Sequence, residues 1–347
     1  MNGNWKIAIV GAASLRGKEL NEALGESVFA EASFTLLDDE EALGQLEAVA
    51  DEVTFIQRIE AAAFIGMDFV FFASDAAVTR KHWKTAQKAG ASVIDLSGAL
   101  ESEPGVLILA PWVREEREGA TLNLDTPAVV SAHPAAVALS LLLKSLNALS
   151  PLRSASATVL EPASEEGRAA MDELHQQTVS LLSFQTLPRA IYDAQVAFNL
   201  LPVFGEESKV NLDAIETRIL DHCRVLLGPE LPPLAVQLIQ APVFHGYTFS
   251  IYIEFATPIA LERVDAALED EHFDVVLGDL DLPSNLTASG QADIVVRVRS
   301  ARASVQEPGK VSGIWIWAAL DNLKFSALNA IACAQELRRL RPQGKVQ

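Results

Sequence analysis

Lys6-Ile-Ala-Ile-Val-Gly-Ala-Ala-Ser-Leu-Arg-Gly17 begins as a short apolar run, continues as a glycine-rich turn and leads into a helical segment. An apolar run of this kind is typical of a strand that is buried on both faces of a parallel sheet. Gly11 can make the tight turn, and Gly17 allows the helix to pack closely on the sheet. This order of elements predicts the phosphate-binding corner of a Rossmann unit. The middle positions of the turn are Ala13 and Ser14, so the third glycine that is usual in this motif is missing. The alternative is therefore that the turn is purely structural and binds no nucleotide.

The chain after this corner alternates between strand-like and helix-like segments up to about residue 130. Such alternation predicts an α/β domain that is built on a doubly wound parallel sheet. The further strands are expected at residues 34–37, 68–73, 92–95, 106–109 and 128–130, and the helices at residues 18–24 and 76–89.

The pattern changes after about residue 150, where long strand-like runs and amphipathic helices replace the short alternation. This combination predicts a second domain of the α+β type with a mostly antiparallel sheet. A last helix begins near Asp321 and is expected to pack back on the first domain. The strands of the second domain are expected at residues 154–160, 234–239, 248–255, 292–298 and 313–319, and its helices at residues 165–182 and 211–226.

Composition limits the class of the protein and its partners. The 347 residues suffice for two domains, and the net charge of −19 argues against nucleic acid and anionic membranes as partners. The two cysteines, Cys223 and Cys333, form neither a disulfide framework nor a zinc-binding spacing, so we expect no metal. The longest apolar run, residues 135–143, is too short to span a bilayer, and the N-terminus has no visible signal peptide. We therefore expect a cytoplasmic protein.

Asp38 stands at the predicted end of the second strand, and Asp39 follows it. A carboxylate at this place in a Rossmann unit accepts hydrogen bonds from a ribose 2′-hydroxyl, whereas it repels a 2′-phosphate. If a dinucleotide binds, NAD should be favoured over NADP. The alternative is that both carboxylates belong to a solvated acidic turn.

Segments spread over nearly the whole chain match one family in order and spacing. They are Ile9–Gly17, Val93–Ala99, Ser131–Pro134, Ala170–Leu174, Ala197–Pro202, Ala241–Gly246 and Asp321–Leu323. With these segments the chain resembles the aspartate-β-semialdehyde dehydrogenases. The resemblance implies a homodimer with a dinucleotide-binding domain at residues 1–130 and 321–347. It places a substrate-binding and dimerisation domain at residues 131–320.

The family's reaction belongs to amino-acid biosynthesis. A cysteine thiolate attacks the aldehyde, a hydride passes to NADP, and phosphate releases the acyl group. The resemblance therefore implies an NAD(P)-binding oxidoreductase that acts on an aldehyde. The cofactor contacts that it implies are Gly11, Ala13, Ser14, Leu15, Gly17, Asp38 and Asn322.

Several positions that carry the family's chemistry hold other residue types in this chain. The nucleophile, a substrate-positioning glutamine, the carboxylate-binding arginine, the acid/base histidine and the phosphate-binding arginine align with Ala136, Glu161, Gln240, Tyr247 and Glu101, respectively. A glutamate that contacts the substrate amine aligns with Glu216, and Arg218 lies near it. An arginine lost from a carboxylate site removes a charge-assisted pair, and a glutamate at a phosphate site adds repulsion.

Thioester chemistry requires a nucleophile, and an alanine side chain has none. The first hypothesis is therefore a non-catalytic homologue, a pseudoenzyme that binds a nucleotide or a partner protein. A second hypothesis is an NAD-dependent enzyme of changed chemistry, in which His133, Glu161 and Tyr247 act as acid and base, with His245 two residues before Tyr247. A third is a semialdehyde dehydrogenase whose nucleophile lies elsewhere in the chain.

Overall fold

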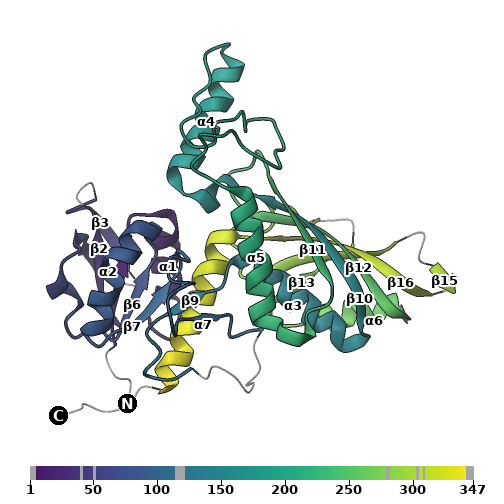
Figure 1. The fold of residues 1–347 in the computed structure, drawn as a ribbon, viewed down its shortest axis with the longest axis horizontal. Coiled ribbons are helices and arrows are strands. Elements are labelled where there is room, and N and C mark those ends of the chain that lie inside the picture. Colours follow the sequence, from purple (N-terminus) through teal and green to yellow (C-terminus); the bar gives the residue numbers. More distant parts are fainter. Residues whose placement is uncertain are drawn as a thin grey trace. The chain divides into compact units, whose positions relative to one another are not determined.

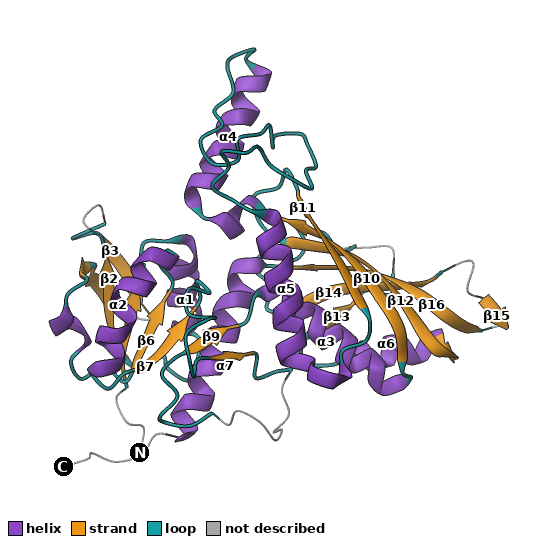
Figure 2. Ribbon diagram, in the orientation of Figure 1, coloured by secondary structure: helices purple, strands orange, loops and turns teal. Residues whose placement is uncertain are grey.

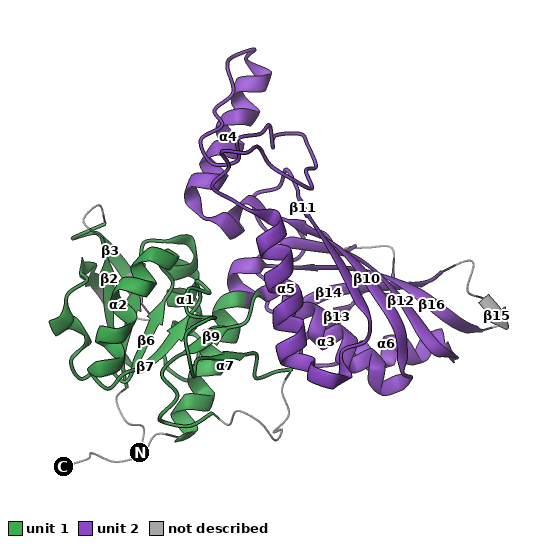
Figure 3. Ribbon diagram, in the orientation of Figure 1, with its two compact units in different colours: residues 1–133, 326–347 green, residues 134–325 purple. Residues whose placement is uncertain are grey.

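The chain forms two compact units in a computed structural model (Figure 3). Unit 1 contains Met1–His133 and Ser326–Gln347, and unit 2 contains Pro134–Phe325. The chain thus passes from one unit to the other after residues 133 and 325. From the sequence, the domain boundaries were expected after residues 130 and 320. The structure describes residues 5–39, 42–49, 52–113, 122–278, 282–301, 305–307 and 309–340.

Unit 1 contains a seven-stranded sheet in the order β5-β2-β1-β6-β7-β9-β8, and every neighbouring pair in it is parallel. The predicted doubly wound sheet is confirmed. The strand order reverses between β1 and β6, the place where ligands bind in sheets of this kind. The strands are β1 (Lys6–Val10), β2 (Ser33–Asp38), β5 (Gln57–Arg58), β6 (Phe69–Phe72), β7 (Ser92–Asp95), β8 (Leu107–Leu109) and β9 (Val129–Ser131).

Alternate residues of the same strand are buried on opposite faces of this sheet. Ile7 and Ile9 of β1 belong to one apolar cluster with residues of α1 (Leu15–Gly25) and α7 (Asn322–Leu340). Ala8 belongs to a second cluster, which contains Trp83 of α2 (Ala76–Lys88). Since both faces are covered, the strand has no polar face, and its sequence is an uninterrupted apolar run.

Unit 2 contains a mixed sheet in the order β11-β10-β12-β16-β14-β13, with β15 paired to β16 (Figures 1 and 2). The pairs β10–β11 and β13–β14 are parallel and the others are antiparallel, which confirms the predicted α+β domain. The strands are β10 (Leu152–Glu161), β11 (Leu234–Gln240), β12 (Tyr247–Ala260), β13 (Phe273–Val275), β14 (Ile294–Ser300), β15 (Val305–Glu307) and β16 (Lys310–Leu320).

The helices of unit 2 fall into two groups. Three of them, α3 (Pro134–Leu149), α5 (Leu212–Leu227) and α6 (Leu261–Leu268), contact the sheet, and α3 also contacts both α5 and α6. The short helix η2 (Ala163–Glu166) and α4 (Arg168–Leu182) follow directly after β10 and contact each other. A further short helix, η3 (Gly228–Glu230), follows α5. Along the described part of the chain, no helix is both long and apolar enough to cross a membrane.

The unit 2 sheet has one apolar face and one mixed face. Phe249 and Ile251 of β12 are buried, whereas Ser250 and Tyr252 between and after them are half-buried. On the mixed face, β12, β14 and β16 line a hollow of about 540 Å³. The residues that line it are Ser250, Leu282, Pro283, Arg297, Val298, Arg299, Trp315, Ile316 and Trp317.

Several short elements were not expected from the sequence. They hold too few residues to show a helix or strand period, so pattern alone cannot distinguish them from loops. They are β3 (Leu46–Val49), which pairs with β4 (Glu52–Phe55), η1 (Ala61–Phe64), β5, α6, β13 and β15.

Candidate functional site

The glycine-rich corner follows β1, where the backbone of the turn lies against the residue after β6. Gly11 has a φ of +83°, and a Cβ at this position would lie 2.6 Å from the Ser74 backbone nitrogen. A Cβ at Gly17 would lie 2.0 Å from the Gly11 carbonyl oxygen. Side chains at these two positions would push α1 away from the sheet, so the two glycines set the close approach of helix and strands.

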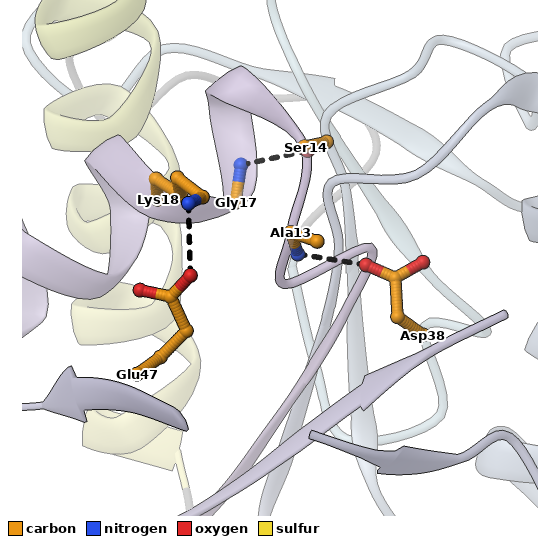
Figure 4. Close-up of polar contacts among 6 residues, drawn as sticks. All are labelled: Ala13, Ser14, Gly17, Lys18, Asp38 and Glu47. Carbon is orange, nitrogen blue, oxygen red and sulfur yellow. Dashed lines mark hydrogen bonds and ion pairs between the residues drawn. The ribbon is translucent and has the colours of Figure 1, made fainter. Parts of the chain in front are cut away.

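Ser14 caps the N-terminus of α1 (Figure 4). Its hydroxyl accepts a hydrogen bond from the Gly17 N–H at 2.9 Å and donates one to the Ala73 carbonyl, also at 2.9 Å. The helix start, whose first residue is Leu15, is thereby tied to the end of β6. Backbone N–H groups in the first turn of a helix at this edge of a parallel sheet favour a bound phosphate.

Asp38 ends β2 and holds the turn in place. Its Oδ2 accepts a hydrogen bond from the Ala13 N–H at 2.7 Å (Figure 4). Its Oδ1 accepts one from the Asp39 N–H at 2.9 Å. A carboxylate therefore lies directly at the glycine-rich turn. Beside it, Lys18 of α1 forms an ion pair with Glu47 of β3 at 2.8 Å. This pair is partly exposed, so its contribution to stability is small.

A second loop at the same edge of the unit 1 sheet is organised by Asp95, which is fully buried at the end of β7. Its carboxylate accepts hydrogen bonds from the Ser97 N–H at 2.7 Å, the Ser97 hydroxyl at 2.6 Å and the Leu100 N–H at 3.0 Å. Glu101, which the sequence resemblance assigned to the position of a phosphate-binding arginine, follows this loop and is half-buried.

Sequence reasoning did not single out the hydroxyl groups between these two loops. Ser97 Oγ lies 3.1 Å from Thr79 Oγ1, which in turn lies 3.4 Å from Ser74 Oγ. Ser74 is the residue against which Gly11 packs. The sequence signal was a small polar residue directly after a buried strand, which is too common to predict a site by itself.

Ala136 lies in the first turn of α3 and is fully buried. The Sγ atom of Cys223, on α5, lies 3.7 Å from the Ala136 carbonyl oxygen. Burial raises the pKa of the Cys223 thiol to about 12, and the neighbouring Ser140 hydroxyl and Arg224 offset this only in part. Cys223 therefore stays a neutral thiol, and the second cysteine, Cys333, is also fully buried with a raised pKa. His133, the last residue of unit 1 before α3, is buried as well.

Glu161, which the sequence resemblance assigned to the substrate pocket, and Tyr247, which it assigned to the acid/base position, meet in the interior of unit 2. The Tyr247 hydroxyl donates a hydrogen bond to Glu161 Oε2 at 3.2 Å, and both residues are fully buried. Burial raises the pKa of Tyr247 well above its usual value, and the nearby Glu161 carboxylate adds to the shift. Tyr247 is therefore a phenol, able to donate a proton, across the physiological pH range.

The other substrate-pocket positions bond to backbone atoms of unit 2. Gln240 Nε2 donates hydrogen bonds to the Glu161 carbonyl at 3.0 Å and to the Ala241 carbonyl at 2.9 Å. Glu216 Oε2 accepts one from the Leu238 N–H at 2.8 Å. Arg218 lies half-buried on α5. Gln240 thus connects β11 to β10, and Glu216 connects α5 to β11.

Asn322, at the start of α7, is also engaged within unit 2. Its Oδ1 accepts hydrogen bonds from the Ser164 hydroxyl and the Gly246 N–H, both at 3.1 Å, and its Nδ2 donates to Glu165 Oε2 at 3.0 Å. His245 lies half-buried in the turn before β12, not on the strand, because β12 begins at Tyr247. Within the described ranges, no group of three or more His, Cys, Asp or Glu side chains is placed to hold a metal ion.

Two family models match the chain. The model described as "Semialdehyde dehydrogenase, NAD binding domain" matches residues 6–120, and the model described as "Semialdehyde dehydrogenase, dimerisation domain" matches residues 143–325. The chain belongs to the semialdehyde dehydrogenase family. The resemblance drawn from the sequence segments is confirmed, and unit 1 carries the NAD-binding domain of that family.

Known proteins extend the similarity over nearly the whole chain. A Pseudomonas aeruginosa protein named "USG-1 protein homolog" is 34% identical over 95% of this chain and 97% of its own length. A Rickettsia bellii aspartate-semialdehyde dehydrogenase is 27% identical over 97% of this chain and 98% of its own length. The solved structure of a probable aspartate-semialdehyde dehydrogenase from Pseudomonas aeruginosa matches with a TM-score of 0.83 and 32% identity, over 97% of this chain and 99% of that one.

Replacement of Gly11 by alanine tests the close approach at the corner. Because Gly11→Ala meets both a positive φ and the Ser74 backbone, we expect the free energy of unfolding to fall by about 2–5 kcal/mol. Gly66 is the matched control, because it has a φ of +75° and open space around it, so Gly66→Ala should cost only about 1–2 kcal/mol. Urea unfolding followed by circular dichroism measures both. Equal losses would show that the contact with Ser74 carries no cost.

Alkylation tests the state of the two thiols. With a pKa of about 12, only about one Cys223 side chain in 10⁴ is a thiolate at about pH 8. We expect iodoacetamide to leave Cys223 and Cys333 unmodified in the native protein and to modify both in urea, as followed by mass spectrometry. Rapid modification of Cys223 in the native protein would contradict the burial argument.

Proposed function

We propose that this chain is a non-catalytic member of its family, which binds a dinucleotide, NAD in preference to NADP, and assembles as a homodimer. The observation that carries the proposal is the fully buried methyl group of Ala136 in the first turn of α3. A methyl group cannot attack an aldehyde, so the covalent acyl intermediate of the family's reaction has no atom on which to form. We place the protein in the cytoplasm as part of this proposal.

Cys223 does not replace the missing nucleophile. Its thiol is on α5, is fully buried and has a pKa of about 12, whereas a nucleophilic cysteine needs a lowered pKa and access to substrate. The family's two arginine positions carry Gln240 and Glu101, so the carboxylate and phosphate groups of the reaction have lost their cationic partners. Loss at several independent positions supports loss of the reaction more strongly than the loss at Ala136 alone.

Nucleotide binding is supported by the NAD-binding family model over residues 6–120 and by the geometry of the glycine-rich corner. The residues that would hold the cofactor in unit 1 are Gly11 to Gly17, through the first turn of α1, and Asp38. The Asp38 carboxylate lies 2.7 Å from the Ala13 N–H, so a 2′-phosphate at this turn would meet a negative charge. A ribose hydroxyl would instead donate a hydrogen bond to it.

A second candidate function is an NAD(P)-dependent oxidoreductase that acts on an aldehyde without a covalent step. The buried Glu161–Tyr247 pair favours it, because a phenol that stays protonated can donate its proton to a carbonyl oxygen as the carbon is reduced. Bound NAD(P)H would supply the hydride. Against this candidate, both side chains are fully buried and already bonded to each other.

An activity assay separates the two candidates. We expect the purified protein, given aspartate semialdehyde, phosphate and either NADP or NAD, to show no turnover and no acylated residue by mass spectrometry. A catalytic family member assayed in parallel is the positive control. Turnover with an acyl adduct would overturn the proposal. Reduction of an aldehyde by NADH or NADPH that Tyr247→Phe abolishes would establish the second candidate instead.

Calorimetry tests the nucleotide preference. We expect NAD to bind at least about tenfold more tightly than NADP, because the 2′-phosphate faces Asp38. Asp38→Asn keeps an acceptor for the Ala13 N–H and removes the charge, so it should reduce the preference for NAD by about tenfold. Asp39→Asn, the matched control, removes a neighbouring exposed charge and should change the ratio less. Binding of neither nucleotide would leave the corner as a structural turn.

A further inference from the structure

Glu161, Gln240 and Tyr247 lie at one edge of the unit 2 sheet. The parallel strands β10 and β11 end at Glu161 and Gln240, which are direct partners in the register. β12 runs antiparallel to β10 and begins at Tyr247, beside that end of β10. All three residues are buried, so each polar atom at this edge has to find its hydrogen-bond partner away from bulk water.

The side-chain amide of Gln240 has a fixed orientation at this edge. Its Nε2 donates hydrogen bonds to the carbonyl oxygens of Glu161 at 3.0 Å and Ala241 at 2.9 Å. Because a carbonyl oxygen can only accept, the nitrogen has to face these two atoms, and Oε1 is the atom left over. Among the described residues, this buried oxygen has no hydrogen-bond partner. The edge therefore presents an acceptor that requires a donor from outside the chain.

Tyr192, in the loop after α4, brings a second such atom to the same place. It is fully buried in an apolar cluster against which Leu201 packs. Leu201 pairs with Gln240 through two backbone hydrogen bonds, at 3.1 and 2.9 Å. Over the described part of the chain, the Tyr192 hydroxyl also has no hydrogen-bond partner. A bound molecule that pairs with both atoms would remove the cost of burying them.

Three carboxylates determine the charge at this edge. Glu161 ends β10, and Glu165 and Glu166 follow it in η2. Burial raises the pKa of Tyr192, and the Glu166 and Glu161 carboxylates add to the shift. The same two carboxylates act on Tyr247, together with Glu165. Both phenols thus lie in one negative field, which favours a cation and repels an anion in a site that holds little water.

The free atoms and the charge together define the class of ligand. Tyr247 donates its only proton to the Glu161 carboxylate, so its oxygen also has only lone pairs left to offer. A primary ammonium group carries three N–H donors and a positive charge, and it meets both requirements. Within the described ranges, no three carboxylates are placed to hold a metal ion, which favours a polyatomic cation.

We propose that this edge of unit 2 binds a small primary amine in its ammonium form, and that the amine carries no carboxylate group. No side chain of the site is basic, so a carboxylate on the ligand would have no cationic partner. The site shares no residue with the dinucleotide-binding corner, because all of its residues belong to unit 2. They are Glu161, Glu165, Glu166, Tyr192, Gln240 and Tyr247.

Isothermal titration calorimetry of the full chain at constant ionic strength tests the class of ligand. The probes are methylammonium and n-butylammonium chloride, with sodium butyrate and 1-butanol as the anionic and neutral counterparts. We expect at least one ammonium ion to bind with a Kd of about 1 mM, as suits a ligand of so few atoms. Butyrate and butanol should bind at least about tenfold more weakly, since neither offers a charged N–H donor.

Tyr192→Phe tests the location of the site, because it keeps the ring and removes only the hydroxyl. We expect it to weaken ammonium binding by about tenfold. It should not lower the free energy of unfolding without ligand, because the hydroxyl has no partner among the described residues. Tyr252→Phe is the matched control, since it removes the hydroxyl of a half-buried tyrosine further along β12 and should leave the affinity unchanged. Urea unfolding measures the stability of both variants.

Three outcomes would overturn the amine site. The first is that neither ammonium ion binds at concentrations up to about 50 mM, far above the expected Kd. The second is that butyrate binds as tightly as n-butylammonium, which contradicts the negative field. The third is that Tyr192→Phe and Tyr252→Phe bind the ammonium ion equally well, which places the amine elsewhere. Because the titrations contain no nucleotide, each of these failures leaves the proposed dinucleotide binding as it was.

Discussion

The close approach of two backbones at the glycine-rich corner is the constraint on which unit 1 depends. β1 and β6 lie side by side at the centre of the sheet, and the Gly11 turn lies so near Ser74 that a methyl group would come within 2.6 Å of its backbone nitrogen. Because no side chain separates them there, the cap on α1 can reach Ala73, and Asp38 can reach the Ala13 N–H. The features that suit the corner to a dinucleotide follow from that absence of side chains.

Unit 2 shows how buried polar side chains are accommodated in the interior of the second domain. Each needs a partner there, because burial without a hydrogen bond is costly. Gln240 bonds to backbone carbonyls, Glu216 to the Leu238 N–H, and Tyr247 to Glu161. These bonds connect β10 to β11 and β12, and α5 to β11.

In α4 and the loop that follows it, buried polar residues fix the conformation of a surface loop. Glu173 and Gln177 form hydrogen bonds with the backbone of one loop, and the segment that leaves the loop exposes apolar side chains to solvent. A loop that is fixed in advance loses little entropy on association, so a small apolar contact can yield more affinity than a flexible one of equal area.

The sequence by itself determined the doubly wound sheet, the α+β second domain and the alanine at position 136. Buried strands such as Ile7–Val10 of β1 and Phe69–Phe72 are short apolar runs, and the residue at position 136 is an alanine in any fold. Only the tertiary structure decided what the polar candidates do. Asp38 bonds to a residue 25 positions away, Gln240 to one 79 positions away, and Tyr247 to one 86 positions away. Local pattern carries no information on such pairs, because the path of the whole chain brings their atoms together.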